Sequence, residues 1–253
     1  MRVATIASLA LAAVPSALAA SKGKLGFSLG TKNPDGTCKY QADYEKDFDA
    51  IAANTDSKIV RGYSASDCNA AQQILPAAKS KGFQVVLAVW PDVDESFNKD
   101  KAALTEYVPK FKDQVYAVTV GSEALYRGSL TGEELLNKIN DISDALPGTL
   151  VGTADSWNKF ADGTADALIK GGVKLFLANA FAYWQGDNVG DGATKTYLDD
   201  LQQALGHIQE LAGSTDSFEF WNGESGWPTD GGDDYDNAKA GTENAAKFFH
   251  EAV

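Results

Sequence analysis

Residues 218–229, FEFWNGESGWPT, join a short apolar run to a glycine, an acid and a second tryptophan. A similar order occurs earlier, in residues 116–128, YAVTVGSEALYRG, where an apolar run ends at Gly121 and Glu123. Each apolar run is typical of a buried strand, and the glycine allows the backbone to turn where the strand ends. The two segments therefore predict that Glu123 and Glu224 stand at strand ends, although they are far apart in the chain.

Outward from these segments the chain alternates short apolar runs with longer helical patterns. The expected strands and the helices that follow them are residues 24–30 and 40–54, 58–62 and 67–81, 83–89 and 98–112, 115–120 and 131–145, 149–153 and 159–170, 173–180 and 194–211, and 218–221 and 240–253. Strands that alternate with helices at this spacing predict a parallel sheet in an α/β protein. No linker-like composition divides the series, so we expect one domain.

Two α/β architectures fit this alternation. A doubly wound sheet usually carries a glycine-rich phosphate loop after its first strand, whereas residues 30–39 read GTKNPDGTCK and match no such motif. A TIM barrel places its working residues at the carboxyl ends of several strands. The tryptophans all fall near such ends, at Trp90, Trp157, Trp184, Trp221 and Trp227. We therefore expect a TIM (β/α)8-type barrel, with the eighth strand–helix unit missing from this chain.

The N-terminal residues 1–19 have the features of a signal peptide. Arg2 precedes an apolar run that is too short to span a membrane, and Ala17-Leu18-Ala19 fits a signal-peptidase site. The remaining residues 20–253 form the expected domain, secreted and free of the membrane after cleavage. Export permits a disulfide between Cys38 and Cys68, the alternative being two unpaired thiols.

Composition narrows the chemistry. The chain of 253 residues has a formal net charge of −13, which disfavours nucleic acid as a partner. Two histidines and two cysteines are too few for a typical structural zinc site, and His207 and His250 both lie in helical patterns. The acidic residues 230–234 lack the EF-hand pattern. We expect no metal and no cofactor, and any catalysis should depend on carboxylates.

Two carboxylates that converge on one cleft suit the hydrolysis of a glycosidic bond. One must give a proton to the leaving oxygen, while the other must be ionised to attack or to activate water. In an eight-stranded barrel, strands four and seven both border one cleft, so Glu123 and Glu224 could reach the same bond. The alternative interpretation of each glutamate is a loop residue that caps a helix.

Four segments carry a resemblance to a known family. VTVGSEALYRG, WNGESGWPTDGG, IVRGYSASDCNAAQQILPAAKSKGFQVVLAVWPD and LFLANAFAYWQG are similar to glycoside hydrolase family 17, in its fungal cell-wall β-1,3-glucanase and glucanosyltransferase branch. The resemblance implies a TIM barrel and a reaction that retains anomeric configuration. It further implies that Glu123 is the general acid/base and Glu224 the nucleophile. Retention further implies carboxyl groups about 5–5.5 Å apart.

Other residues at the expected strand ends are candidates for binding the substrate. Arg61 could pair with Glu224, or form a helix-facing salt bridge instead. Asp155 could bind a sugar hydroxyl or cap a loop. Ser122 stands where much of the clan has an asparagine that bonds the sugar 2-hydroxyl. Sugar contacts are also expected from Tyr63, Trp90, Asn179, Tyr183, Trp184, Trp221 and Trp227.

Two functions follow from this set of residues. The first is a secreted, monomeric enzyme that hydrolyses or transfers β-1,3-glucan in a cell wall. The second is a wall protein that binds glucan without turnover, because the eighth strand is missing. Reducing-sugar release from oligosaccharides would separate the two, since both would bind glucan.

Overall fold

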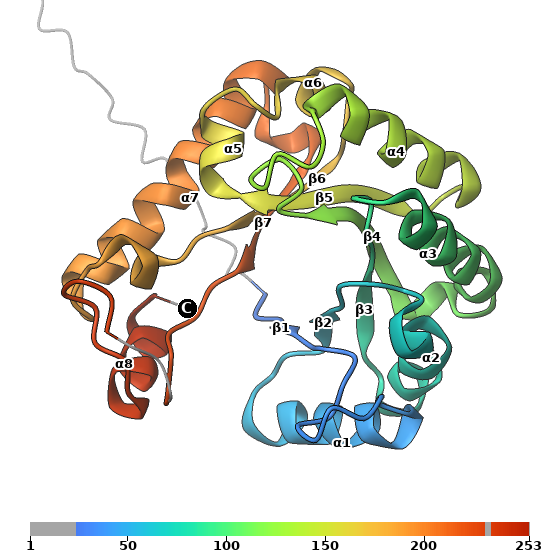
Figure 1. The fold of residues 1–253 in the computed structure, drawn as a ribbon, viewed down its shortest axis with the longest axis horizontal. Helices are drawn as coiled ribbons and strands as arrows, with labels where there is room; N and C mark the ends of the chain where they lie inside the picture. The colour runs from blue at the N-terminus through green and yellow to red at the C-terminus, as the bar shows by residue number, and fades with distance from the viewer. Residues whose placement is uncertain (1–23, 231–233, 253) are drawn as a thin grey trace, which may run out of the picture.

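The computed structural model describes residues 24–230 and 234–252. Seven parallel strands form one sheet in sequence order, and the sheet is curled so that the helices lie around its outer face (Figure 1). The strands are β1 (Phe27–Ser28), β2 (Ile59–Arg61), β3 (Gln84–Val89), β4 (Val115–Ser122), β5 (Leu150–Ser156), β6 (Leu175–Asn179) and β7 (Glu219–Glu224). The predicted parallel α/β sheet is therefore confirmed as a curled half-barrel.

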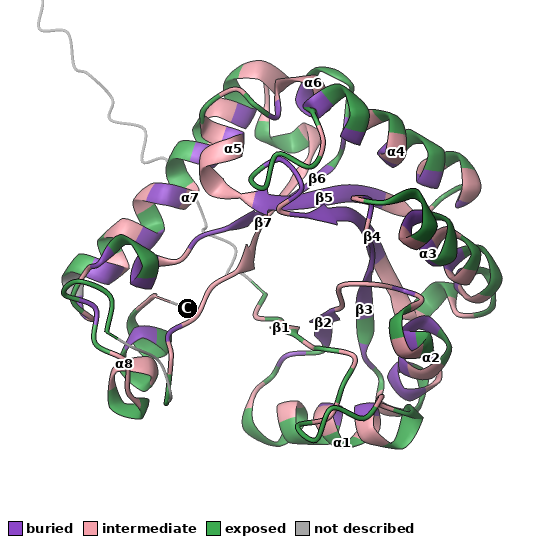
Figure 2. Ribbon diagram, in the orientation of Figure 1, coloured by how far each residue is buried: buried purple, intermediate pink, exposed green. Residues whose placement is uncertain are grey.

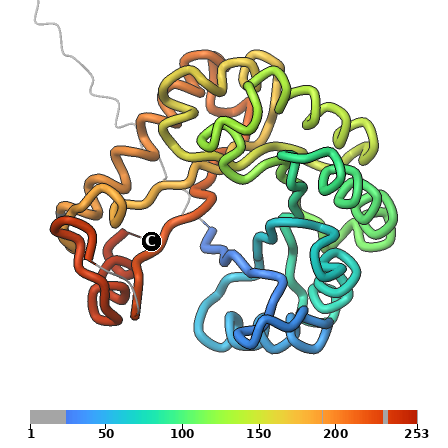
Figure 3. The backbone as a smooth tube through the Cα atoms, in the orientation of Figure 1, coloured from blue at the N-terminus to red at the C-terminus, as the bar shows by residue number. Residues whose placement is uncertain are grey.

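Helices connect each strand to the next. The α-helices are α1 (Gln41–Asn54), α2 (Ala70–Lys81), α3 (Asp94–Tyr107), α4 (Gly132–Ala145), α5 (Trp157–Ala161), α6 (Asp166–Lys170), α7 (Asp191–Ala212) and α8 (Thr242–Ala252). Short 3₁₀ segments are η1 (Asp67–Asn69), η2 (Val108–Lys110), η3 (Lys112–Gln114), η4 (Ala182–Gln185) and η5 (Thr215–Ser217). In Figure 3 the chain travels once around the sheet, from β1 to β7. Among the described residues, β1 and β7 do not pair with each other.

Apolar side chains cover both faces of the sheet, which is why its middle strands are almost wholly buried (Figure 2). The larger cluster lies between strands and helices and includes the stacked rings of Phe48 and Phe83, with centroids 4.5 Å apart. A smaller cluster contains strand residues only and lines the inner face: Ile59, Val86, Ala117, Ala154, Leu175 and Leu177. Burial on both faces is typical of strands in parallel sheets, and it explains the continuous apolar runs in the sequence.

Several boundaries differ from the sequence-based expectation. The single helix expected over residues 159–170 is two short helices, because Gly163 adopts a φ of +87° between α5 and α6. The helix expected over residues 98–112 begins earlier and ends at Tyr107, and η2, which contains Pro109, follows it. The first strand has only two residues in place of the expected run 24–30.

The predicted disulfide is confirmed: Cys38 and Cys68 are bonded and tie the loop after β1 to η1. The predicted signal peptide, residues 1–19, lies outside the described residues. Within the described part of the chain, no helix combines the length and hydrophobicity that crossing a bilayer requires.

Candidate active site

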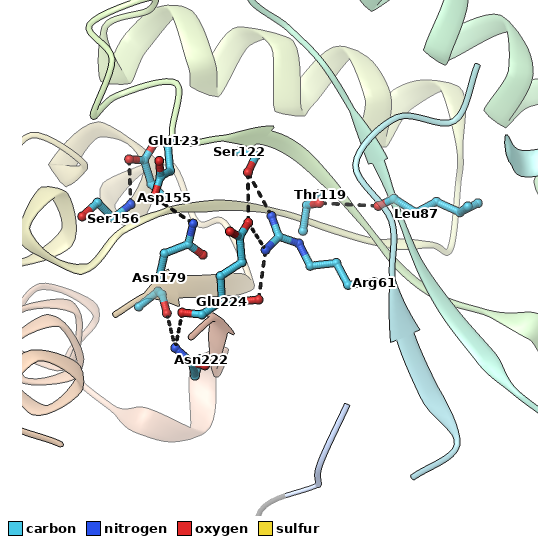
Figure 4. A network of polar contacts seen from close by, with 12 residues as sticks. Arg61, Leu87, Thr119, Ser122, Glu123, Asp155, Ser156, Asn179, Asn222 and Glu224 are labelled. Carbon is cyan, nitrogen blue, oxygen red and sulfur yellow. Dashed lines mark hydrogen bonds and ion pairs between the residues drawn. The ribbon is translucent and has the colours of Figure 1, made fainter. Parts of the chain in front are cut away.

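Glu123 and Glu224 both follow an irregularity in strand pairing. On β4 the register with β5 shifts between Thr119 and Ser122, and on β7 the register with β6 shifts just before Glu224. Bulges of this kind redirect side chains and are common beside active sites. The glycines of the two sequence segments, Gly121 and Gly223, lie within the two shifts. The strand ends thus turn both glutamates toward one network of polar groups (Figure 4).

Gly223 has to be a glycine, because there is no room for a side chain at this position. A β-carbon at this position would lie 2.6 Å from the Oδ1 atom of Asn179 and 2.9 Å from the β-carbon of Leu177. The side chain of Asn179 therefore fills the space that a larger residue would occupy. Asn179 is 2% exposed, and its Nδ2 group donates a hydrogen bond of 3.0 Å to Glu123 Oε1. The missing side chain at Gly223 therefore leaves room for the amide that contacts Glu123.

Glu224 is held by a buried cation. Arg61, at the end of β2, donates from Nη1 to Glu224 Oε1 at 2.9 Å and to the carbonyl oxygen of Gly223 at 3.0 Å. Its Nη2 group donates to the hydroxyl of Ser122 at 3.2 Å, and that hydroxyl lies 3.4 Å from Glu224 Oε1. Of the two alternatives for Arg61, the structure shows pairing with Glu224. The hydroxyl of Ser122 therefore bonds to Arg61 and Glu224 within the protein.

Glu123 sits on a strained turn. Its φ is +59°, a left-handed conformation that a side chain with a β-carbon seldom adopts. The preceding Gly121 also has a positive φ, of +94°. The N–H of Glu123 donates to the carbonyl oxygen of Ala154 at 3.0 Å, which ties the turn to β5. Strained residues of this kind are often found at active sites, where the surrounding structure holds them in place.

Asp155, at the end of β5, binds the backbone of this turn. Its carboxylate accepts from the N–H groups of Leu125, at 2.8 Å, and Tyr126, at 3.1 Å. A third bond of 2.9 Å comes from the N–H of Ser156. Burial raises the pKa of Asp155 to about 6, although these hydrogen bonds oppose the shift and the nearby Glu123 adds to it. The loop-capping alternative for Asp155 is the one that the structure shows.

Tyr63 stands beside the Arg61–Glu224 pair, with the Arg61 guanidinium 4.9 Å from its ring centroid. Burial raises the pKa of the Tyr63 hydroxyl, and the carboxylate of Glu224 raises it further. Arg61, Tyr63 and Glu224 line one end of a cavity of about 1050 Å³ that follows the inner face of β1 and β7. The end of β2 and the end of β7 therefore border the same cavity.

The predicted aromatic residues lie in different settings. Trp184 is 60% exposed beside Tyr235, with ring centroids 5.5 Å apart, and could present a flat face to a sugar. Tyr183 and Trp227 pack in a second core cluster, and the Trp227 indole donates to the carbonyl oxygen of Lys239. The sugar contacts of Tyr183 and Trp227 stay predictions, and the structure gives both residues a packing role.

Trp221 lies away from the strand ends that carry the glutamates. Its ring packs against Tyr116, at the start of β4, with centroids 4.9 Å apart, and its indole donates to Glu219 at 3.2 Å. Trp90 lies near the strand ends, where the guanidinium of Arg127 covers its ring at 4.6 Å. Arg127 lies in the segment VTVGSEALYRG, but sequence reasoning missed it as a site residue, because its contacts with Trp90 and Asp92 cross from another loop.

The two histidines lie outside this network. His207 on α7 contacts Asp166 on α6 at 2.8 Å, and His250 is on α8. Within residues 24–230 and 234–252, no three histidines, cysteines or acids are arranged to hold a metal ion. The described polar groups of the site are therefore carboxylates, amides, hydroxyls and guanidinium groups.

Comparisons with known proteins agree with the geometry. Residues 26–253 match the family described as the BtgE/BtgC glycoside hydrolase domain. A glucan 1,3-beta-glucosidase of Arthroderma benhamiae is 57% identical over 253 residues, which are 100% of this chain and 81% of that protein. A glucan 1,3-beta-glucosidase of Saccharomyces cerevisiae is 42% identical over 91% of this chain and 76% of its own length.

Solved structures give the same result. The glycoside hydrolase family 17 beta-1,3-glucanosyltransferase of Rhizomucor miehei superposes with a TM-score of 0.77 at 27% identity, over 90% of this chain and 80% of that one. An active-site mutant of that enzyme, in complex with laminaritriose, superposes with a TM-score of 0.75 at 26% identity, over 89% of this chain and 80% of the mutant. The family match and these relatives show that the chain belongs to the BtgE/BtgC glycoside hydrolase family.

Proposed function

We propose that this glycoside hydrolase cleaves or transfers β-1,3-glucan with retention of anomeric configuration. The observation that carries the proposal is that two sets of contacts meet where β6 and β7 pair: Asn179 bonds to Glu123, and its register partner Glu224 bonds to Arg61. The relatives named glucan 1,3-beta-glucosidase and the neighbour bound to laminaritriose support the choice of substrate.

In this mechanism Glu224 attacks the anomeric carbon while Glu123 protonates the departing oxygen. The bond to the leaving sugar breaks, and a covalent glycosyl ester forms on Glu224. Glu123, now ionised, then removes a proton from water, which attacks the same carbon and releases Glu224. If the hydroxyl of a second glucan takes the place of water, the product is a transferred chain.

The surroundings of the two glutamates suit these roles. A nucleophile must be ionised when it attacks, and Arg61 places a positive charge against Glu224 at 2.9 Å. An acid/base must exchange a proton, and Glu123 is contacted by the neutral amide of Asn179. The retaining mechanism further predicts that the two carboxyl groups stand about 5–5.5 Å apart.

Two further proposals concern the fold and the location of the protein. The curled sheet is seven of the eight strand–helix units of a TIM barrel, as the superposition on the family 17 structures supports. The protein is exported and acts at a cell wall, which the signal-like residues 1–19 and the Cys38–Cys68 disulfide support.

The test is turnover of laminari-oligosaccharides by the wild-type chain and three variants. Glu123→Gln and Glu224→Gln should lose reducing-sugar release and chain-length redistribution. Glu106→Gln, on the exposed side of α3, is the matched control and should match the wild type. Proton NMR of the first product should show the β-anomer, and an initial α-anomer would contradict the retaining mechanism.

An alternative function is glucan binding without turnover. It is favoured by the cavity that extends from Glu224 along β1 and β7, whose facing edges are unpaired among the described residues. Under this alternative, calorimetry would detect oligosaccharide binding while neither hydrolysis nor transfer would occur. Turnover that disappears in Glu224→Gln would exclude it.

A further inference from the structure

The turn that carries Glu123 is bound by two side chains, Asp155 from the end of β5 and Arg127 from the same loop. A non-glycine residue at a φ of +59° costs energy, so the turn needs outside contacts to persist. Within the turn, the N–H of Arg127 donates to the carbonyl oxygen of Glu123 at 3.0 Å. Further contacts to the turn come from the carboxylate of Asp155 and from the side chain of Arg127.

After Glu123, the backbone presents N–H groups, and Asp155 accepts them. One carboxylate oxygen of Asp155 binds the N–H of Leu125 at 2.8 Å, and the other binds the N–H of Tyr126 at 3.1 Å. Asp155 is fully buried, and each of its three hydrogen bonds comes from a backbone N–H. Both oxygens are thus committed to the protein backbone.

Before Glu123, the backbone presents the carbonyl oxygen of Ser122, and Arg127 donates to it from Nη1 at 2.6 Å. The rest of the guanidinium is fixed by the segment after β3. Its Nη2 group donates to Asp92 at 2.8 Å, and its plane lies 4.6 Å from the ring centroid of Trp90. Asp92 is also held by the hydroxyl of Ser129 at 2.8 Å. Arg127 therefore links the turn to the end of β3.

We propose that Asp155 and Arg127 are positioning residues that hold Glu123 in its left-handed turn by binding the backbone on either side of it. This inference rests on the assignment of Glu123 as the acid/base. Both side chains act through the backbone of the turn. Their effect is on where the Glu123 carboxyl stands relative to the leaving oxygen.

The burial of Asp155 argues that its charge serves the turn. Removing a carboxylate from water is unfavourable, and here burial outweighs three hydrogen bonds in setting the direction of the pKa shift. An asparagine of the same shape would carry no charge, but its NH₂ group could not accept an N–H of the turn. Residues that are costly to the fold are often retained for function.

The experiment compares two substrates in Asp155→Asn, Arg127→Gln and Arg127→Lys. Laminari-oligosaccharides have a poor leaving group and need the proton of Glu123, whereas a dinitrophenyl β-glucoside has a good leaving group and does not. We expect kcat on the oligosaccharide to fall by about 10- to 100-fold in Asp155→Asn and Arg127→Gln, since small displacements of a catalytic group have effects of this size. Arg127→Lys should recover part of the loss.

The leaving group separates positioning from general damage. First turnover of the aryl glucoside should fall several times less than oligosaccharide turnover, and azide should accelerate later turnovers, as we also expect for Glu123→Gln. Asp162→Asn is the matched control, because Asp162 also accepts a backbone N–H in a loop after β5, from Thr164 at 2.9 Å, but lies away from the network. It should show neither effect.

Three results would overturn the proposal. Equal losses on the two substrates would mean that the variants damage the fold in general. Unchanged turnover in both Asp155→Asn and Arg127→Gln would mean that the turn holds itself. If instead Glu123→Gln still cleaves the oligosaccharide like the wild type, the proposed function fails first, and the positioning role with it.

Discussion

The two glutamates are held in opposite ways. Glu224 is held through its side chain, by a guanidinium 2.9 Å away and a hydroxyl 3.4 Å away, on a strand end where its φ is not positive. Glu123 is held mainly through its backbone, in a left-handed turn bound by Asp155 and Arg127, while its carboxyl receives one bond from Asn179.

This difference corresponds to the two tasks. A nucleophile must keep one charge and one direction, which a fixed cation provides. An acid/base must gain and lose a proton, so a strong ion pair on its carboxyl would oppose half of its cycle. Holding the backbone fixes where such a carboxyl stands without fixing its charge.

The largest effect should come from Glu224→Gln. An amide cannot form the glycosyl ester, so turnover should fall by about 10⁴-fold on both oligosaccharides and activated aryl glucosides. Glu123→Gln should lose about 10²- to 10⁴-fold on oligosaccharides, while first turnover of the aryl glucoside should fall much less. First-turnover rates on the two substrates measure the contrast. Equal behaviour of the two variants would remove the distinction between nucleophile and acid/base.

Arg61→Met should have the next largest effect. The variant leaves Glu224 without its cation and the Gly223 carbonyl without a donor. The free energy of unfolding should therefore fall by about 2–3 kcal/mol. In a chain of this size that lowers Tm by roughly 5–10 °C, and turnover should fall by about 10²-fold.

The matched control for Arg61→Met is Lys81→Met, which breaks the ion pair between Lys81 and Asp49. The side chain of Asp49 is more than half exposed. Surface pairs contribute about 0–1 kcal/mol, so Tm should hardly change. Thermal melting of both variants tests the difference. A similar small shift in both would show that Arg61 does not balance a buried charge.

Gly223→Ala should disturb Glu123 from the side of β7. The added β-carbon would meet Asn179 Oδ1 at 2.6 Å, which pushes the amide away from Glu123. We expect oligosaccharide turnover to fall by about 10-fold or more. Gly226→Ala is the control, since nothing lies within 4 Å of a β-carbon there. Equal activity of the two variants would mean that Asn179 is free to move.

The last prediction concerns how the stability of the protein depends on pH. Burial raises the pKa of Asp155 from 3.8 to about 6, so folding takes up a proton between these values. A raised native pKa stabilises the fold at low pH, and this stabilisation, about 3 kcal/mol, is lost as pH rises through 6. Urea unfolding at pH 4 and pH 7 should show that wild type loses stability relative to Asp155→Asn as pH rises. A constant difference would contradict the shift.

Sequence alone predicts the strands that carry the site, because an apolar run that ends in glycine and glutamate is legible without coordinates. The pairing of Arg61 with Glu224 was one of two alternatives, and only the register of β2 beside β1 and β3 decides between them. Asp155 was similarly open, since a carboxylate after a strand can face either a ligand or a backbone turn.

Other features depend on contacts that no local pattern contains. The role of Gly223 comes from Asn179, which reaches it from the neighbouring strand. Trp221 and Trp227 resemble the other tryptophans in sequence, yet one packs against Tyr116 and the other lies in the second core cluster. These contacts depend on which face of the strand a side chain lies on and on the position of α8, and both are properties of the assembled fold.

The most direct test of the central claim is to trap the glycosyl enzyme. A 2-deoxy-2-fluoro-glucosyl fluoride or its laminaribiose analogue forms the ester rapidly and releases it slowly, so mass spectrometry of proteolytic peptides can locate the sugar. The account predicts one adduct per chain, on Glu224, and none in Glu224→Gln. An adduct on Glu123, or turnover of oligosaccharides without any adduct, would contradict it.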